Sequence, residues 1–267
     1  MTQRQLSLDL YIKQDASLSD FAGPGWLTVI DAVRQAHVGL VNQLYLQGEA
    51  DTGKSHLLAA IGESFRELGS SVIYLSMREL VGLDPQVVGG LEHMDMIAID
   101  DIDAIEGHAG WQEAIFHLIN RSRERSQDAQ VLLAFASRKP FGQLDFGLQD
   151  LKSRLAKSLL VALPTGSDRS DRALILQAVL KRRNWQFDPR ITDYLLDEGP
   201  KRIGAMLEVL TAVQPMFTNL ERAHVTKAKV QAAIKLIDER TLLDELRDLT
   251  SDDDTLASDR QQDWLDF

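Results

Sequence analysis

The 267-residue sequence predicts an α/β fold with a five-stranded parallel sheet, followed by a small all-helical domain. Short apolar runs that suit buried strands alternate with helical patterns through the first part of the chain. After residue 165 this alternation stops, and four helical patterns follow one another. We expect the strands within residues 42–47, 71–76, 96–99, 131–137 and 159–163.

Composition and charge exclude several kinds of protein. The chain has no cysteine, which rules out disulfides and thiolate metal sites and favours the cytoplasm. Its formal net charge of −11 opposes autonomous binding to the DNA backbone, so no direct sequence-specific DNA contact is expected. No apolar stretch approaches the length of a membrane span. The histidines lack ligand spacing and are interpreted as structural or surface residues: His37, His56, His93, His108, His117 and His224.

The strongest signal is a glycine-rich loop directly behind the first apolar run. The string "GEADTGKS" completes the motif G-x-x-x-x-G-K-S, whose backbone N–H groups wrap phosphates. In such a loop the lysine, here Lys54, neutralises phosphate oxygens, and the hydroxyl, here Ser55, reaches Mg²⁺. An amphipathic helix follows, with apolar residues at Leu57, Leu58, Ile61, Phe65 and Leu68. The sequence therefore predicts a site for ATP or ADP with Mg²⁺, made by Gly48, Glu49, Ala50, Asp51, Thr52, Gly53, Lys54, Ser55 and His56.

A second motif supports the same site. The string "IAIDD" is an apolar run that ends in Asp100 and Asp101. A phosphate-binding loop needs a carboxylate at the end of a neighbouring strand to orient the metal ion. We therefore expect Asp100 to hold the water shell of Mg²⁺ and Asp101 to polarise the attacking water.

These motifs, with the helical segment behind them, resemble the AAA+ ATPases, and among them the DnaA initiator family over about residues 5–240. The resemblance implies an AAA+ P-loop NTPase core over residues 16–164 and a helical lid domain over residues 165–240. The alternation of predicted strands with predicted helices agrees with the parallel, doubly wound sheet of such a core.

The resemblance also implies residues that contact nucleotide from other elements. "ASRKP" is similar to the sensor-1 corner and places Ser137 beside the γ-phosphate. "GLQDLKSRLAKS" is similar to the box with the arginine finger, which falls on Arg154. "GPKRIGAML" is similar to the sensor-2 segment of the lid, where either Lys201 or Arg202 takes the place of the arginine. Because a finger acts on nucleotide held by a neighbouring subunit, association through AAA+ surfaces is expected, including self-association.

The opening string "QLSLDL" carries leucines at alternate positions behind a glutamine. This pattern is typical of a core strand or of an extended docking peptide. On a DnaA-like chain it resembles the clamp-binding peptide of the regulatory inactivators of DnaA, the Hda family. The resemblance implies an N-terminal peptide and linker over residues 1–15, with the DNA polymerase sliding clamp (the β subunit) and DnaA as partners. The clamp contacts would be made by Gln5, Leu6, Leu8 and Leu10.

Residues 241–267 form an acidic segment that we expect to be disordered and to lack a DNA-binding helix-turn-helix. Its last residues, "QDWLDF", repeat the spacing of the opening peptide with Gln262, Leu265 and Phe267. A second clamp-binding peptide and a chance pattern both remain open.

The function implied is negative regulation of replication initiation, in which Arg154 completes the active site of ATP-bound DnaA and leaves inactive ADP-DnaA. Hydrolysis by the chain itself is expected to be weak, because a finger must come from a neighbour. Two alternatives are a helicase-loader-type adaptor, which would have no clamp peptide, and a self-contained P-loop ATPase or kinase, which would need neither finger nor lid.

Overall fold

A computed structural model of the chain describes residues 15–125, 131–214, 226–237 and 239. Within these ranges the chain forms two units. The first contains residues up to Trp185 together with Lys201–Gly204, and the second contains Gln186–Pro200 and the residues from Ala205 onward.

The first unit is built on a five-stranded sheet in the order β2-β3-β4-β1-β5. Every neighbouring pair of strands is parallel. Each strand lies within one residue of its predicted range, which confirms the predicted sheet. The strands are β1 Gln43–Gln47, β2 Val72–Ser76, β3 Met96–Asp100, β4 Leu132–Ser137 and β5 Leu159–Ala162.

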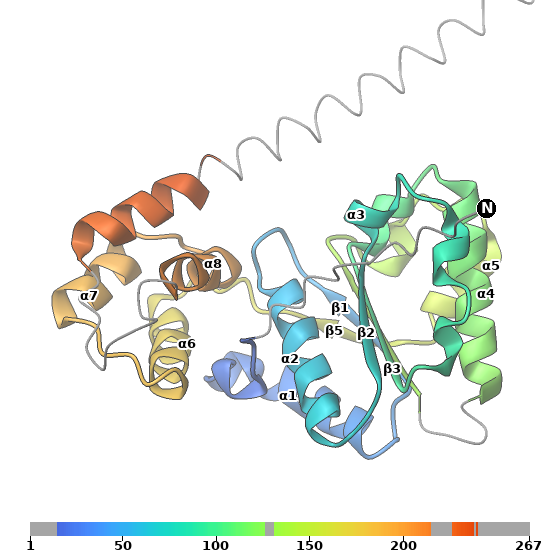
Figure 1. Ribbon diagram of the computed structural model, residues 1–267, viewed down its shortest axis with the longest axis horizontal. Coiled ribbons are helices and arrows are strands. Elements are labelled where there is room, and N and C mark those ends of the chain that lie inside the picture. Colours follow the sequence, from blue (N-terminus) through green and yellow to red (C-terminus); the bar gives the residue numbers. More distant parts are fainter. Residues whose placement is uncertain (1–14, 126–130, 215–225, 238, 240–267) are drawn as a thin grey trace, which may run out of the picture. The chain divides into compact units, whose positions relative to one another are not determined.

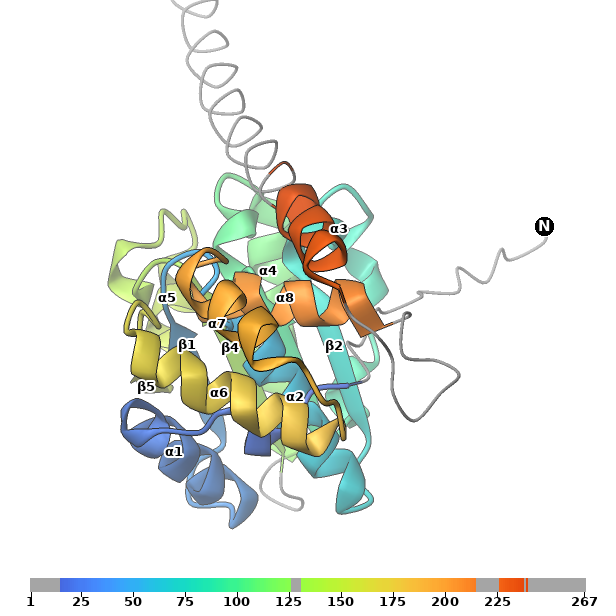
Figure 2. The same cartoon turned by 90° about the vertical axis from the view of Figure 1, so that its left-hand side faces the viewer.

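Helices cover both faces of this sheet, as parallel crossovers require. Figure 1 shows α1 (Leu27–His37) and α2 (Lys54–Glu67) on one face and α4 (Ala109–Arg125) and α5 (Gln149–Leu155) on the other. Figure 2 views the unit from the side of α1 and α2. A short helix, α3 (Met77–Leu80), follows directly from β2.

The apolar stripe of α2 packs as predicted except at its end. Leu57, Leu58, Ile61 and Phe65 are buried, whereas Leu68 is 69% exposed. The helix ends at Glu67, and Gly69 follows with a φ of +84°. Because the chain leaves the helix there, Leu68 no longer continues the buried stripe, and its predicted place on that stripe is wrong.

The four predicted helices behind the sheet are present. Asp168 caps α6 (Arg169–Arg182) by accepting from Ser170 N, and Asp188 caps α7 (Pro189–Asp197) by accepting from Arg190 N. They are followed by α8 (Ile203–Val213) and by a helix over residues 227–237. Helix α6 falls in the first unit, so the lid boundary at residue 165 remains a prediction. None of the helices in the described ranges combines the length and apolar character that a membrane crossing requires.

A buried carboxylate ties three segments of the first unit together. Asp20 is fully buried at the end of the 3-10 helix η1 (Leu18–Asp20). Arg182 of α6 donates from Nε to Asp20 Oδ1 at 2.6 Å and from Nη2 to Oδ2 at 2.9 Å. His56 Nε2 of α2 lies 3.1 Å from Oδ2. Burial alone would raise the pKa of Asp20, but the bonds from His56 and Arg182 hold it below its usual value.

Replacing Asp20 by Asn should lower the free energy of unfolding at pH 7 by about 3 kcal/mol, because the partly buried Arg182 loses its charged partner. The pKa of Asp20 is lowered from 3.8 in the folded chain. Its stabilisation is therefore complete above that pH and is lost as the pH falls through the folded value. Urea unfolding at several pH values measures this, and the two proteins should converge only in acid.

Asp31→Asn is the control, since the Asp31 carboxylate is exposed and accepts only an exposed bond from Gln35. It should change the free energy of unfolding by less than about 0.5 kcal/mol. Equal losses in the two variants at pH 7 would show that the buried ion pair does not stabilise the unit.

Candidate nucleotide-binding site

Three of the predicted site segments meet where three neighbouring strands end. Gln47, the last residue of β1, pairs with Ser137, the last residue of β4. On the other side of β4, Asp100 ends β3. Because parallel strands point the same way, the phosphate loop behind β1, the acidic pair of β3 and the corner behind β4 share one edge of the sheet.

The loop after β1 has the geometry of a phosphate cradle. Lys54 Nζ donates to the carbonyl oxygens of Gly48 at 2.8 Å and Glu49 at 2.7 Å, so its ammonium group lies within the loop. Gly53 has a φ of +89°, which glycine adopts without strain, and α2 begins at the next residue. A Cβ at Gly48 would come within 2.5 Å of Thr52 Oγ1. A larger residue at Gly48 would therefore require Thr52 to move.

The acidic pair lies in a strongly charged, buried setting. Asp100 is 2% exposed, and its Oδ1 accepts from Asp101 N at 3.0 Å. Burial, and then the negative charge of Asp100, raise the pKa of Asp101 to about 6, although Arg78 at 3.6 Å opposes the rise. Burial also lowers the pKa of Lys54, against the attraction of the carboxylates. The charges of Lys54 in the loop and of the two aspartates therefore interact with one another.

A tyrosine that the sequence analysis did not single out completes this group. Tyr74 of β2 donates a hydrogen bond from its hydroxyl to Asp100 Oδ2. Burial, followed by the charge of Asp100, raises the pKa of this hydroxyl, so it stays a donor. The motif strings did not indicate it, because only the pairing of β2 with β3 brings Tyr74 near Asp100.

Ser137, the last residue of β4, is buried, and its side chain is hydrogen-bonded within the protein. Ser137 is fully buried, donates from Oγ to Asp103 Oδ1 at 2.9 Å and accepts from Lys139 N at 3.0 Å. The next residue, Arg138, lies with its Nε 3.5 Å from Asp103 Oδ2, and its charge contributes to the lowered pKa of Lys54, after burial. The corner therefore brings a cation near the loop that the sequence analysis missed.

Of the two sensor-2 candidates, Arg202 contacts the phosphate loop. It donates from Nη1 to the carbonyl oxygen of Ala50 at 2.8 Å, and its Nη2 lies 2.8 Å from Glu49 Oε2. Lys201 instead accepts at its carbonyl oxygen from Arg172 Nη1 at 3.2 Å. The His56 side chain, as described above, bonds to Asp20 and is buried.

Arg154 lies apart from these groups. Its guanidinium carbon is 5.8 Å from the ring centroid of Phe116 on α4, the layer opposite α2 (Figure 1). Its charge, after burial, lowers the pKa of Arg123 near the end of the same helix. Arg154 therefore belongs with α4 and α5 rather than with the helix that starts at Lys54.

The first unit also matches a known family. The model of the bacterial DnaA ATPase domain matches residues 27–162, which is 136 of the 267 residues. The chain belongs to this family. The match covers the sheet, the phosphate loop and the segment with Arg154 in this DnaA-family chain.

Solved structures share the AAA+ P-loop fold of this DnaA-family chain. Domain III of Thermotoga maritima DnaA has a TM-score of 0.63 and 21% identity, and the match covers 84% of this chain and 97% of that domain. A replication initiator DnaA bound to AMPPCP and single-stranded DNA has a TM-score of 0.59 and 25% identity, over 80% of this chain and 67% of the other. The Thermotoga maritima RuvB Holliday junction branch migration motor has a TM-score of 0.55 and 17% identity, over 84% of this chain and 73% of the other.

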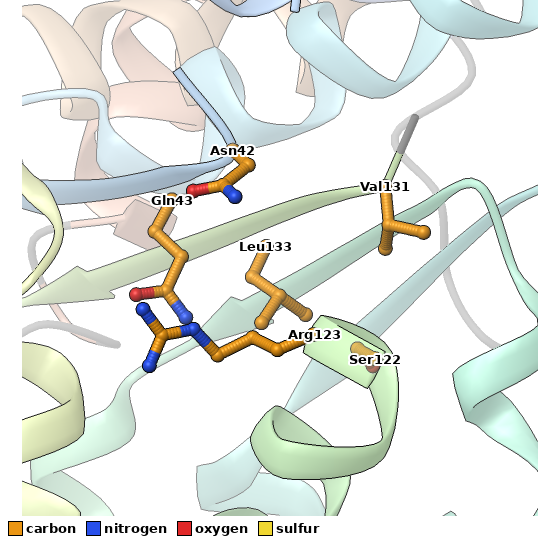
Figure 3. A pocket seen from close by; sticks show the side chains of 6 residues that line it. All are labelled: Asn42, Gln43, Ser122, Arg123, Val131 and Leu133. Atoms are coloured by element: carbon orange, nitrogen blue, oxygen red, sulfur yellow. The ribbon is translucent and has the colours of Figure 1, made fainter. Parts of the chain in front are cut away.

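A small cavity lies at the other end of the sheet, where β1 and β4 begin (Figure 3). Gln43 is 2% exposed there, and neither polar atom of its amide has a hydrogen-bond partner. The cavity leaves no room for a water molecule, so it is not a ligand site. Its lining residues are Asn42, Gln43, Ser122, Arg123, Val131 and Leu133.

The two predicted clamp-binding peptides of this DnaA-family chain lie outside the described residues. They are the segments with Gln5, Leu6, Leu8 and Leu10 and with Gln262, Leu265 and Phe267.

Replacing Gly204 by Ala should lower the free energy of unfolding by about 1–2 kcal/mol, although alanine is the better helix former by about 1 kcal/mol. Gly204 N donates to Asp51 O at 2.7 Å, and a Cβ at Gly204 would lie 2.7 Å from the same oxygen. The phosphate loop must shift to admit it. Gly142→Ala is the control for urea unfolding, because a Cβ there meets nothing within 4 Å. A Gly204→Ala protein as stable as this control would contradict the close approach.

Proposed function

We propose that the chain binds ATP or ADP with Mg²⁺ at the phosphate loop, docks on the sliding clamp and stimulates ATP hydrolysis by DnaA. It would thereby act in the cytoplasm as a negative regulator of replication initiation. Family membership supports the relation to DnaA, and the 25%-identical DnaA structure bound to AMPPCP supports an adenine nucleotide as ligand.

The residues of the loop fit a nucleotide. The Lys54 ammonium group would exchange its bonds to the carbonyl oxygens of Gly48 and Glu49 for bonds to phosphate oxygens. Arg202 contacts the same loop, because it donates a hydrogen bond to the carbonyl oxygen of Ala50. Ser55 and Asp100 offer the oxygen ligands that Mg²⁺ prefers, with most of the remaining ligands coming from water and phosphate. When bound, the ion would neutralise phosphate charge. Asp101, next to Asp100, would orient water toward the terminal phosphate.

The observation that carries the regulatory role is the position of Arg154. It is the last residue but one of α5, and Leu159, which begins β5 four residues after that helix, pairs with Leu44 near the start of β1. The phosphate loop instead follows the end of β1. A five-residue strand spans roughly 16 Å, so the arginine and the loop lie at opposite ends of the sheet. Arg154 is thus suited to nucleotide on a neighbouring AAA+ module, which disfavours a self-contained ATPase or kinase.

The proposed clamp contact rests on the opening peptide, which directly precedes Asp15 in the chain. Asp15, the first described residue, accepts at its carbonyl oxygen from Arg182 Nη2 at 2.7 Å, and its Oδ2 lies 2.6 Å from Arg183 Nε. Asp15, the residue that directly follows the proposed peptide, is therefore held against the end of α6. A helicase-loader-type adaptor would need no such peptide.

Arg154→Ala should reduce the stimulation of ATP hydrolysis by DnaA at least 100-fold while leaving nucleotide binding and clamp binding intact. A finger stabilises charge that develops only in the transition state, and such arginines contribute about 10³–10⁵ in rate. The assay needs DnaA preloaded with ATP, clamp on DNA and equal amounts of each variant.

Lys157→Ala is the matched control, because it removes a nearby exposed positive charge outside the predicted finger position. Arg154→Lys should rescue poorly, since lysine lacks the planar fork of arginine. Full stimulation by Arg154→Ala would refute the finger assignment and favour a protein that acts by binding alone.

Changing both Leu8 and Leu10 to Ala should abolish binding to the clamp and leave the melting temperature within about 2 °C of wild type. Each leucine of a docking peptide buries apolar surface only in the complex. Gel filtration with the clamp measures the binding, and thermal unfolding measures stability. A core strand would instead lose several kcal/mol on the double change, so a large drop in melting temperature would contradict the docking peptide.

A further inference from the structure

Tyr74 and Asp100 lie on one side of the pair formed by β2 and β3. Tyr74 pairs with Ala98, and Ser76 pairs with Asp100. Because residues two apart on a strand point to the same face, the long tyrosine side chain reaches diagonally toward the end of β3. Its hydroxyl donates to Asp100 Oδ2.

Both carboxylate oxygens of Asp100 are thereby fixed. Oδ1 accepts from Asp101 N at 3.0 Å, and Oδ2 accepts from the Tyr74 hydroxyl. Each oxygen of an ionised carboxylate keeps further acceptor capacity, which suits donation from water bound to a metal ion. Two donors from different directions leave this buried side chain little freedom to rotate.

We propose that Tyr74 is a positioning residue of the Mg²⁺ site, whose hydroxyl holds the Asp100 carboxylate in the orientation that receives the water shell of the ion. This rests on the proposed nucleotide site. Groups that hydrogen-bond to metal-binding carboxylates orient them, and their loss commonly weakens metal binding by about 10–100-fold. The Tyr74 hydroxyl donates to Asp100 and also interacts with the Ser55 side chain. We assign the positioning role to its bond with Asp100.

A second tyrosine of the sheet provides a matched control. Tyr45 of β1 donates from its hydroxyl to the carbonyl oxygen of Lys139 at 2.7 Å. Tyr45→Phe and Tyr74→Phe each remove a hydroxyl that bonds within the sheet edge, including its interaction with Ser137 or Ser55, and keep the ring. Only the second removes a bond to the carboxylate proposed to serve Mg²⁺.

The test is calorimetric titration of ADP into the full chain, once with Mg²⁺ and once with a chelator. Tyr74→Phe should bind ADP without Mg²⁺ within about twofold of wild type, whereas the gain in affinity on adding Mg²⁺ should fall about tenfold. Tyr45→Phe should keep the whole gain. The affinity without Mg²⁺ also reports whether the variant retains a folded nucleotide site.

Three results would overturn the proposal. They are an undiminished Mg²⁺ gain in Tyr74→Phe, an equal loss with and without Mg²⁺, and an equal loss of the gain in Tyr45→Phe. In an Asp100→Asn background, Tyr74→Phe should have no further effect on the gain, and an additional loss there would show that Tyr74 does not act through Asp100. Failure of wild type to bind ADP would instead refute the proposed function itself, and binding without any Mg²⁺ gain would refute the metal site.

Discussion

The parallel pairing of β3, β4 and β1 is the constraint on which the candidate site depends. Because the three strands run side by side in one direction, the loop behind Gln47, the acids at Asp100 and Asp101 and the corner at Ser137 reach the same edge. A shift of one residue in either pairing would turn the alternate side chains to the opposite face. The arrangement of the candidate site therefore depends on the register of the sheet as well as on the sequence motifs.

Charge balance adds a second constraint at this edge. Asp100, Asp101 and Asp103 all act on Lys54, whose burial would otherwise favour its neutral form. The positive charge of Arg138 has the opposite effect on Lys54 and lowers its pKa. A nucleotide with a divalent cation carries both negative and positive charge. It would therefore match a site that holds both cationic and anionic side chains.

The sequence was sufficient for the strands and the phosphate loop. Buried parallel strands are continuous apolar runs, and a phosphate loop has a fixed spacing, so both are visible in one dimension. The exposure of Leu68 was not visible, because periodicity does not show where a helix ends. Nor were Tyr74 and Arg138, since their contacts with Asp100 and Asp103 arise only when the strands pair.

Binding of ADP with Mg²⁺ to wild type and to Lys54→Ala, compared by calorimetry at equal protein concentration, tests the central claim most directly. Lys54 lies within the loop, bonded to Gly48 and Glu49, and would give these contacts up to phosphate oxygens. We expect wild type to bind ADP and Lys54→Ala to bind at least tenfold more weakly. Equal affinities in the two proteins would contradict a nucleotide site at this loop.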